Sequence, residues 1–159
     1  MSLTNSQVSN NEGRGLEVRD SATVNLSNSQ VSNNRCGLWV EGSATVSLSN
    51  SQVSNNRLGL YVRGSAKVTV RESEISGNKG NGIFLMWKAV AEIWENRIIN
   101  NEGYGVAVYW MGCVDYYDDR FKFAGQVTGG GNTIPGPYEP AGNKGGALCP
   151  GWLDFLKKP

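Results

Sequence analysis

The chain has 159 residues, of which 39% are hydrophobic, and its mean hydropathy of −0.37 is that of one ordinary globular domain. Fifteen Lys and Arg against 14 Asp and Glu give a net charge of +1 without a basic run, so no nucleic-acid partner is expected. No apolar stretch reaches the ~20 residues of a membrane helix, so no membrane partner is expected either. Histidine is absent, which removes the commonest general base and any histidine metal site.

A unit of 22 or 23 residues is repeated five times along the first 110 residues. The first three copies are nearly identical, and the last two have diverged. The copies begin at Leu3, Leu26, Leu48, Val70 and Ile93. A repeat of this length is typical of a stacked array in which each copy buries its apolar side chains against its neighbours.

Within each unit, apolar residues alternate with polar ones, as at Leu60 and Val62 and again at Ala66, Val68 and Val70. A period of two predicts strands, and Gly, Ser and Asn separate the strands from each other. Each unit therefore contains three short strands, and each strand lies on its counterpart in the next unit. The predicted fold is an all-β parallel β-helix of about six coils.

An asparagine stands at one corner of every predicted coil, and it is preceded by Asn or Gly. Asn and Gly tolerate the left-handed backbone that a sharp corner needs, and stacked amides can hydrogen-bond from coil to coil. We therefore expect a structural asparagine ladder made of Asn11, Asn34, Asn56, Asn78 and Asn101.

These coils, over roughly residues 3–134, resemble the right-handed parallel β-helix repeats of the pectate-lyase-like superfamily and of NosD-type repeat proteins. The spacing fits neither a leucine-rich repeat nor the hexapeptide units of a left-handed β-helix. The resemblance implies the fold, and it also implies a place for ligands, because pectate-lyase-like enzymes bind polysaccharides along a strand face of the helix.

After Tyr109 the repeat is interrupted, although the chain is still expected to form a single domain, residues 1–159, with regular coils over 3–110. Residues 111–122 are an inserted loop, and residues 123–159 form a diverged last coil and a C-terminal cap. Apolar residues at helical spacing in Trp152–Lys158 predict a short capping helix. The first coil has no such cap, which predicts a homodimer formed by end-to-end stacking of first coils.

Three cysteines leave at least one thiol free. Cys36 replaces the equivalent of Leu58 at a variable corner and is expected to be an incidental free thiol. Cys113 and Cys149 both belong to the last coils, where neighbouring strands lie ~4.8 Å apart, so a disulfide between them is geometrically feasible. That disulfide would favour a secreted or cell-surface protein, although no signal peptide is visible.

The strand after the glycine of each coil presents outward side chains that include an aromatic stripe. Its first column holds Trp39, Tyr61 and Phe84, and its second holds Arg63 and Tyr109. These rings are expected to pack on each other, to accept Arg63 through a cation–π contact, to lie under the inserted loop, or to receive a sugar ring. The stripe is the candidate binding surface for a polysaccharide or a protein.

Catalytic residues are harder to find. Asp115, Asp118 and Asp119 in the inserted loop have the chemistry to hold calcium or to form an acid pair, but a solvated loop is the simpler interpretation. Glu and Arg alternate beside the stripe, as expected for cross-strand ion pairs. No catalytic residue, metal or cofactor is therefore assigned. The predicted function is structural or binding, and the alternative is a polysaccharide lyase or glycoside hydrolase acting on the Glu/Arg/aromatic face.

Copies two and three differ only at five positions, which also favours a scaffold. The pairs are Cys36/Leu58, Trp39/Tyr61, Glu41/Arg63, Thr45/Lys67 and Ser47/Thr69. An enzyme needs particular residues on particular coils, whereas a scaffold tolerates copying.

Overall fold

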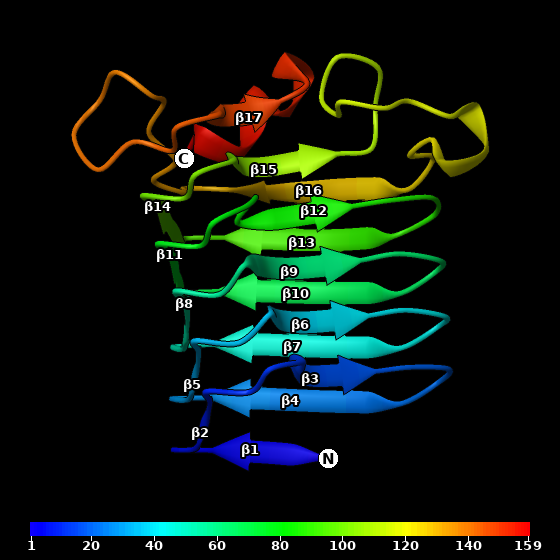
Figure 1. The fold of residues 1–159 in the computed structure, drawn as a ribbon, viewed down its shortest axis with the longest axis vertical. Helices are drawn as coiled ribbons and strands as arrows, with labels where there is room; N and C mark the ends of the chain where they lie inside the picture. The colour runs from blue at the N-terminus through cyan, green and yellow to red at the C-terminus, as the bar shows by residue number, and fades with distance from the viewer.

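The computed structural model describes residues 1–159 and shows the predicted parallel β-helix (Figure 1). Five complete coils stack from the N-terminus upward, and β16 and β17 form part of a sixth. All strand pairs are parallel, and they make three sheets, which we call A, B and C in the order in which the chain first visits them.

The strand bounds follow the repeat. Sheet A contains β1 (Ser2–Thr4), β4 (Thr23–Ser27), β7 (Thr45–Ser49), β10 (Lys67–Arg71), β13 (Val90–Trp94) and β16 (Gln126–Gly130). Sheet B contains β2 (Gln7–Ser9), β5 (Gln30–Ser32), β8 (Gln52–Ser54), β11 (Glu74–Ser76) and β14 (Arg97–Ile99). Sheet C contains β3 (Arg14–Val18), β6 (Cys36–Val40), β9 (Leu58–Val62), β12 (Ile83–Leu85), β15 (Tyr104–Val108) and β17 (Gly146–Cys149).

The core is a set of apolar columns that run parallel to the solenoid axis. Leu26 pairs with Leu48, Leu48 with Val70, and Val70 with Ile93, and all four side chains are fully buried. Because equivalent residues stack in register, each coil buries its apolar side chains against the coil above and the coil below. The first coil has a neighbour on one side only, and its Leu3 is half-buried. Dimerisation through this coil stays a prediction.

The asparagine ladder is present at the corner between sheets B and C. In each step the backbone N–H and the side-chain amide of one Asn both donate to the next Oδ1, for example from Asn34 to Asn56 at 2.9 and 3.1 Å. The side-chain amide of Asn56 also donates to the carbonyl oxygen of Val31 at 3.2 Å. The ladder continues one step beyond the prediction, from Asn101 to Asn143. Residues that precede it, such as Asn33 at φ +57, take the left-handed backbone expected at this corner.

The C-terminal lid is present as a 3-10 helix, η2 (Gly151–Lys157), and it begins and ends one residue before the predicted segment. Leu153 and Leu156 are fully buried, because a period of three residues per turn places them on the same side. The backbone N–H of Asn132 donates to the carbonyl oxygen of Leu156 at 3.1 Å. The lid therefore satisfies part of the edge that the last strand would otherwise expose (Figure 1).

The three cysteines differ in state. Cys113 and Cys149 form a disulfide, which ties the inserted loop to β17. Cys36 is free, but it lies buried at the start of β6 and not at a corner as expected. Burial raises the pKa of its thiol to about 12, so the reactive thiolate is absent at neutral pH.

Candidate functional site

The aromatic stripe lies on the outer face of sheet C, one ring per coil. Trp39 pairs in register with Tyr61, and Tyr61 pairs with Phe84. The Trp39 and Tyr61 rings are stacked, with centroids 4.2 Å apart and planes 16° apart, and Phe84 follows at 5.7 Å. The rings therefore turn their faces toward each other along the solenoid axis.

Other side chains occupy the remaining ring faces. The Arg14 guanidinium, from the coil before Trp39, lies 3.9 Å from the Trp39 ring centroid, whereas Tyr61 comes from the coil after it. Both faces of Trp39 are thus covered. At the far end, Phe84 meets Tyr109 edge to face at 6.3 Å. The stripe presents mainly ring edges to solvent.

Tyr109 stands in the second outward column, but it is not exposed to solvent. The inserted loop covers it, leaving 8% of its surface exposed. Its hydroxyl donates to the carbonyl oxygen of Tyr116 at 2.8 Å and accepts from the backbone N–H of Asp118 at 3.1 Å. Tyr117 stacks on the same ring at 5.7 Å. Of the arrangements expected for the stripe, Tyr109 shows two, because it packs on Phe84 and lies under the inserted loop.

The charged residues beside the stripe are engaged with each other. Glu41 accepts from Arg19 at 2.8 Å and from Arg63 at 2.7 Å, and the indole N–H of Trp39 donates to it at 3.0 Å. The Trp39 hydrogen bond and the two guanidinium groups lower the pKa of Glu41 against the opposing effect of its burial. Arg63 is therefore bound to a carboxylate and is not a free group on the surface.

The three aspartates of the inserted loop do not converge. Asp118 caps the short 3-10 helix η1 (Asp119–Phe121) and binds Arg120 through both its oxygens, and the Arg120 hydrogen bonds lower its pKa. Asp119 accepts from the Tyr117 hydroxyl at 3.0 Å, and Asp115 is exposed without a partner. No group of three His, Cys, Asp or Glu residues is placed to hold a metal ion.

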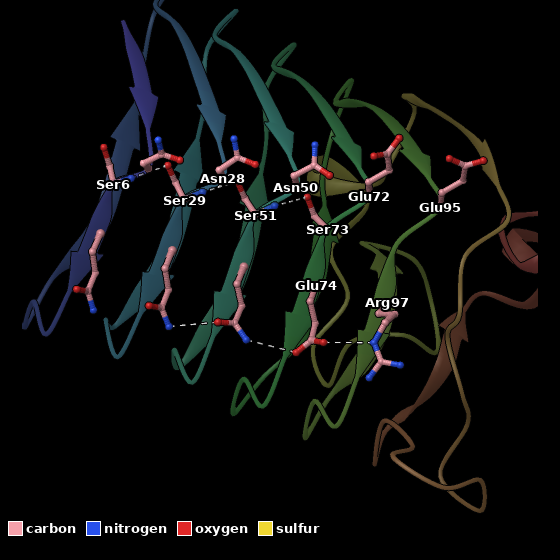
Figure 2. Close-up of a pocket in the computed structure, with 14 residues that line it drawn as sticks. Ser6, Asn28, Ser29, Asn50, Ser51, Glu72, Ser73, Glu74, Glu95 and Arg97 are labelled. Carbon is pink, nitrogen blue, oxygen red and sulfur yellow. Dashed lines mark hydrogen bonds and ion pairs between the residues drawn. The ribbon is translucent and has the colours of Figure 1, made fainter.

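A groove that the sequence reasoning missed runs along the corner between sheets A and B, parallel to the solenoid axis (Figure 2). Its volume is about 910 Å³, it crosses five coils, and every residue that lines it is polar or charged. The corner positions of the groove, in pairs along the chain, are Asn5 and Ser6, Asn28 and Ser29, Asn50 and Ser51, Glu72 and Ser73, and Glu95.

A serine ladder forms the floor of the groove. The backbone N–H of Ser29 donates to Ser51 Oγ at 3.0 Å, and that of Ser51 donates to Ser73 Oγ at 3.1 Å. The Ser51 hydroxyl in turn donates to the carbonyl oxygen of Ser49 at 2.7 Å. Because the serines use both their donors and their acceptors internally, their role is structural. The signal for this ladder was the repeated Asn-Ser-Gln at Asn5, Asn28 and Asn50.

One rim of the groove carries side chains that make no hydrogen bond within the protein. Asn28 and Asn50 stand at left-handed positions, with φ +49 and +46, and their amides are exposed. Glu72 and Glu95 continue the same row on the next two coils and form no ion pair. This rim is neutral in its N-terminal part and acidic in its C-terminal part (Figure 2).

The opposite rim is a chain of side-chain hydrogen bonds. The Gln30 amide donates to Gln52 at 3.2 Å, Gln52 donates to Glu74 at 3.4 Å, and Arg97 donates to Glu74 at 3.3 Å (Figure 2). Hydrogen bonds, first from the Ser76 hydroxyl and then from Arg97, lower the pKa of Glu74 despite its burial. The side chains of one rim of the groove are thus hydrogen-bonded to each other, whereas the side chains of the other rim are free to donate and accept.

The comparisons with known proteins identify the fold without a function. The family model described as "Right handed beta helix region" matches residues 1–117. No curated protein and no solved structure matches the chain. None of the helices in the structure has the length and apolar character needed to span a bilayer.

Proposed function

Because the chain belongs to the right-handed β-helix family, we propose that it is a non-catalytic scaffold that binds an extended neutral saccharide in the groove between sheets A and B. The observation that carries this proposal is the free rim. Asn28 and Asn50 are fixed by the fold, exposed, and without a hydrogen-bond partner in the protein. Primary amides donate and accept at once, as the hydroxyl groups of a sugar do.

The spacing of the rim favours a saccharide over a peptide. Equivalent residues on adjacent coils repeat every ~4.8 Å, whereas an extended peptide advances ~3.3 Å per residue and soon loses register with such a row. One pyranose unit of an extended glycan is close in length to one coil spacing. Five coils therefore offer a run of matched contacts along the groove.

Charge selects among saccharides. Glu72, Glu74 and Glu95 line the C-terminal part of the groove, and Arg97 is the only cation there. Carboxylates are strong acceptors for sugar hydroxyls, but they repel the carboxylates of a polyuronate. We therefore expect neutral glycans to bind and polyuronates to bind poorly.

The aromatic stripe supports this role less well than the groove does. A sugar ring packs on the face of an aromatic ring, and both faces of Trp39 are covered by Arg14 and Tyr61. The stack is accounted for by cross-strand stabilisation of the outer surface of sheet C.

Catalysis is disfavoured by the electrostatics of the carboxyl groups. Wherever a carboxyl pKa is shifted, at Glu41, Glu74 and Asp118, it is lowered by hydrogen bonds and cations. A general acid in glycoside hydrolysis needs the opposite, a raised pKa. The alternative lyase or hydrolase predicts turnover of polyuronates that is lost in Arg63→Ala or Asp118→Ala.

The test uses glycine variants, because glycine accepts the left-handed backbone while it removes the amide. Calorimetric titration of neutral glycan hits from an array should show about tenfold weaker binding to Asn28→Gly/Asn50→Gly. Asn10→Gly/Asn33→Gly is the matched control, because both residues are exposed at left-handed positions outside the groove. If Trp39→Ala/Tyr61→Ala lost glycan binding while Asn28→Gly/Asn50→Gly kept it, the binding site would be the aromatic stripe and not the groove.

A further inference from the structure

Ion pairs join several charged side chains on neighbouring coils of this protein. The pairs are Arg19–Glu41, Glu41–Arg63, Arg71–Glu92, Glu74–Arg97 and Glu102–Lys144. Cross-strand pairing of this kind removes repulsion between successive coils.

One column instead holds three cations in succession. Arg35, Arg57 and Lys79 each directly follow an asparagine of the ladder, and they occupy one corner position on coils two, three and four. The Arg57 backbone N–H donates to Asn34 at 3.0 Å, and that of Lys79 donates to Asn56 at 2.9 Å, which fixes the register. All three side chains are exposed, and none forms an ion pair. Like charges at neighbouring positions repel each other, so no pairing within the protein stabilises this column.

The column borders a cleft of about 640 Å³, and a third arginine, Arg14, also lines this cleft. Arg14, Arg35 and Arg57 line it together with Trp39, and the only carboxylate in the lining is Glu17. Glu17 is already paired with Arg14 and Arg19. The Trp39 ring, 3.9 Å away, and the ion pair with Glu17 hold the Arg14 guanidinium in place, so Arg14 is engaged within the protein whereas Arg35 and Arg57 are not.

We propose that Arg35, Arg57 and Lys79 form a binding site for a short linear chain of phosphate groups. Guanidinium groups bind phosphate oxygens bidentately, and a chain of phosphates places charge opposite successive coils. Glutamates end the column on both sides, Glu12 on coil one and Glu102 on coil five, so the site spans three coils. The site lies on the opposite side of the narrow sheet B from the saccharide groove and is independent of it.

The test is calorimetric titration with tripolyphosphate at low ionic strength. The triple variant Arg35→Gln/Arg57→Gln/Lys79→Gln should bind at least about tenfold more weakly than the unmodified chain, and the affinity of the latter should fall steeply with salt. The matched control is Lys67→Gln/Arg71→Gln/Lys88→Gln, which removes three exposed cations elsewhere and changes the net charge equally. The control should stay within about twofold.

A second measurement separates binding from a structural role. The column variant removes repulsion between like charges, so its thermal midpoint should equal or exceed that of the unmodified chain. A lower midpoint would make the column structural and overturn the proposal. The proposal would also be overturned if tripolyphosphate did not bind, or if the control variant lost as much affinity for it as the column variant. It would likewise be overturned if inorganic phosphate bound as tightly as tripolyphosphate, or if a single-stranded oligonucleotide bound more tightly.

Discussion

Replacing Asn56 in the middle of the asparagine ladder tests how the corner of the solenoid is held together. Asn56 is fully buried, and its Oδ1 accepts from the backbone N–H of Asn34 at 2.9 Å and from the Asn34 amide at 3.1 Å. Its own amide donates to Val31 and to Asn78. Asn56→Ala therefore leaves the Asn34 N–H buried without a partner and removes one of the hydrogen bonds that the Val31 carbonyl oxygen accepts.

The expected cost follows from those two groups. A buried polar group without a partner costs about 1–3 kcal/mol and a lost hydrogen bond about 1 kcal/mol, so the free energy of unfolding should fall by about 2–4 kcal/mol. Asn56 does not lie at a left-handed position, so the alanine adds no backbone strain. Asn11→Ala is the matched control, because Asn11 is exposed at the end of the ladder and its side chain donates only to Asn34, at 2.8 Å.

Urea unfolding of both variants, with the disulfide intact, measures the difference. The control should lose less than about 1 kcal/mol, because water replaces the lost partner. Equal losses in the two variants, or a loss below about 1 kcal/mol at Asn56, would refute the reasoning that the ladder satisfies buried groups.

Three further predictions follow from close approach, burial and charge. A Cβ at Gly59 would lie 2.1 Å from a carbonyl oxygen of the next coil, so Gly59→Ala should destabilise by more than about 2 kcal/mol in urea unfolding; Gly13→Ala, with open space around it, should change the free energy of unfolding little. The Cys36 thiol, with its pKa at about 12, should react with a thiol reagent at pH 8 only after unfolding, and rapid reaction of the native protein would contradict its burial. The Trp39 hydrogen bond and two guanidinium groups lower the pKa of Glu41 in the folded protein. Glu41 therefore stabilises the fold above its unfolded pKa of about 4.5, and this stabilisation is lost as the pH falls through the folded pKa. In Glu41→Gln the free energy of unfolding should decrease less steeply with falling pH in this range.

The repeat made most of the fold predictable. Residues such as Leu48 and Val70 recur at one position of the coil, and a period of two tells which side chains point inward, so the strands and the core columns followed from spacing alone. The asparagine ladder was predictable for the same reason. Asn56 recurs where a corner must fall, and only a side chain with both a donor and an acceptor can satisfy the backbone there.

The candidate sites were less predictable, because they depend on how outward side chains arrange themselves. The spacing placed Trp39 and Tyr61 in one row, but it did not indicate that their faces would cover each other. The groove depends on left-handed corner residues such as Asn28, which direct a free amide outward while the following serine turns inward. The inserted loop is unique in the chain, so the repeat did not indicate which ring of the stripe the loop would bury, and the structure shows that it is Tyr109.

The most direct test of saccharide binding in the groove follows NMR signals from the side chains that line it. Side-chain amide resonances of Asn and Gln, and the indole N–H resonances of Trp, are followed by NMR while a neutral oligosaccharide identified by array screening is added. Binding in the groove should shift the amide resonances of Asn28, Asn50, Gln30 and Gln52, whereas the Trp39 indole N–H, held by Glu41, should not shift. Shifts at Trp39 without shifts at the four amides would contradict it.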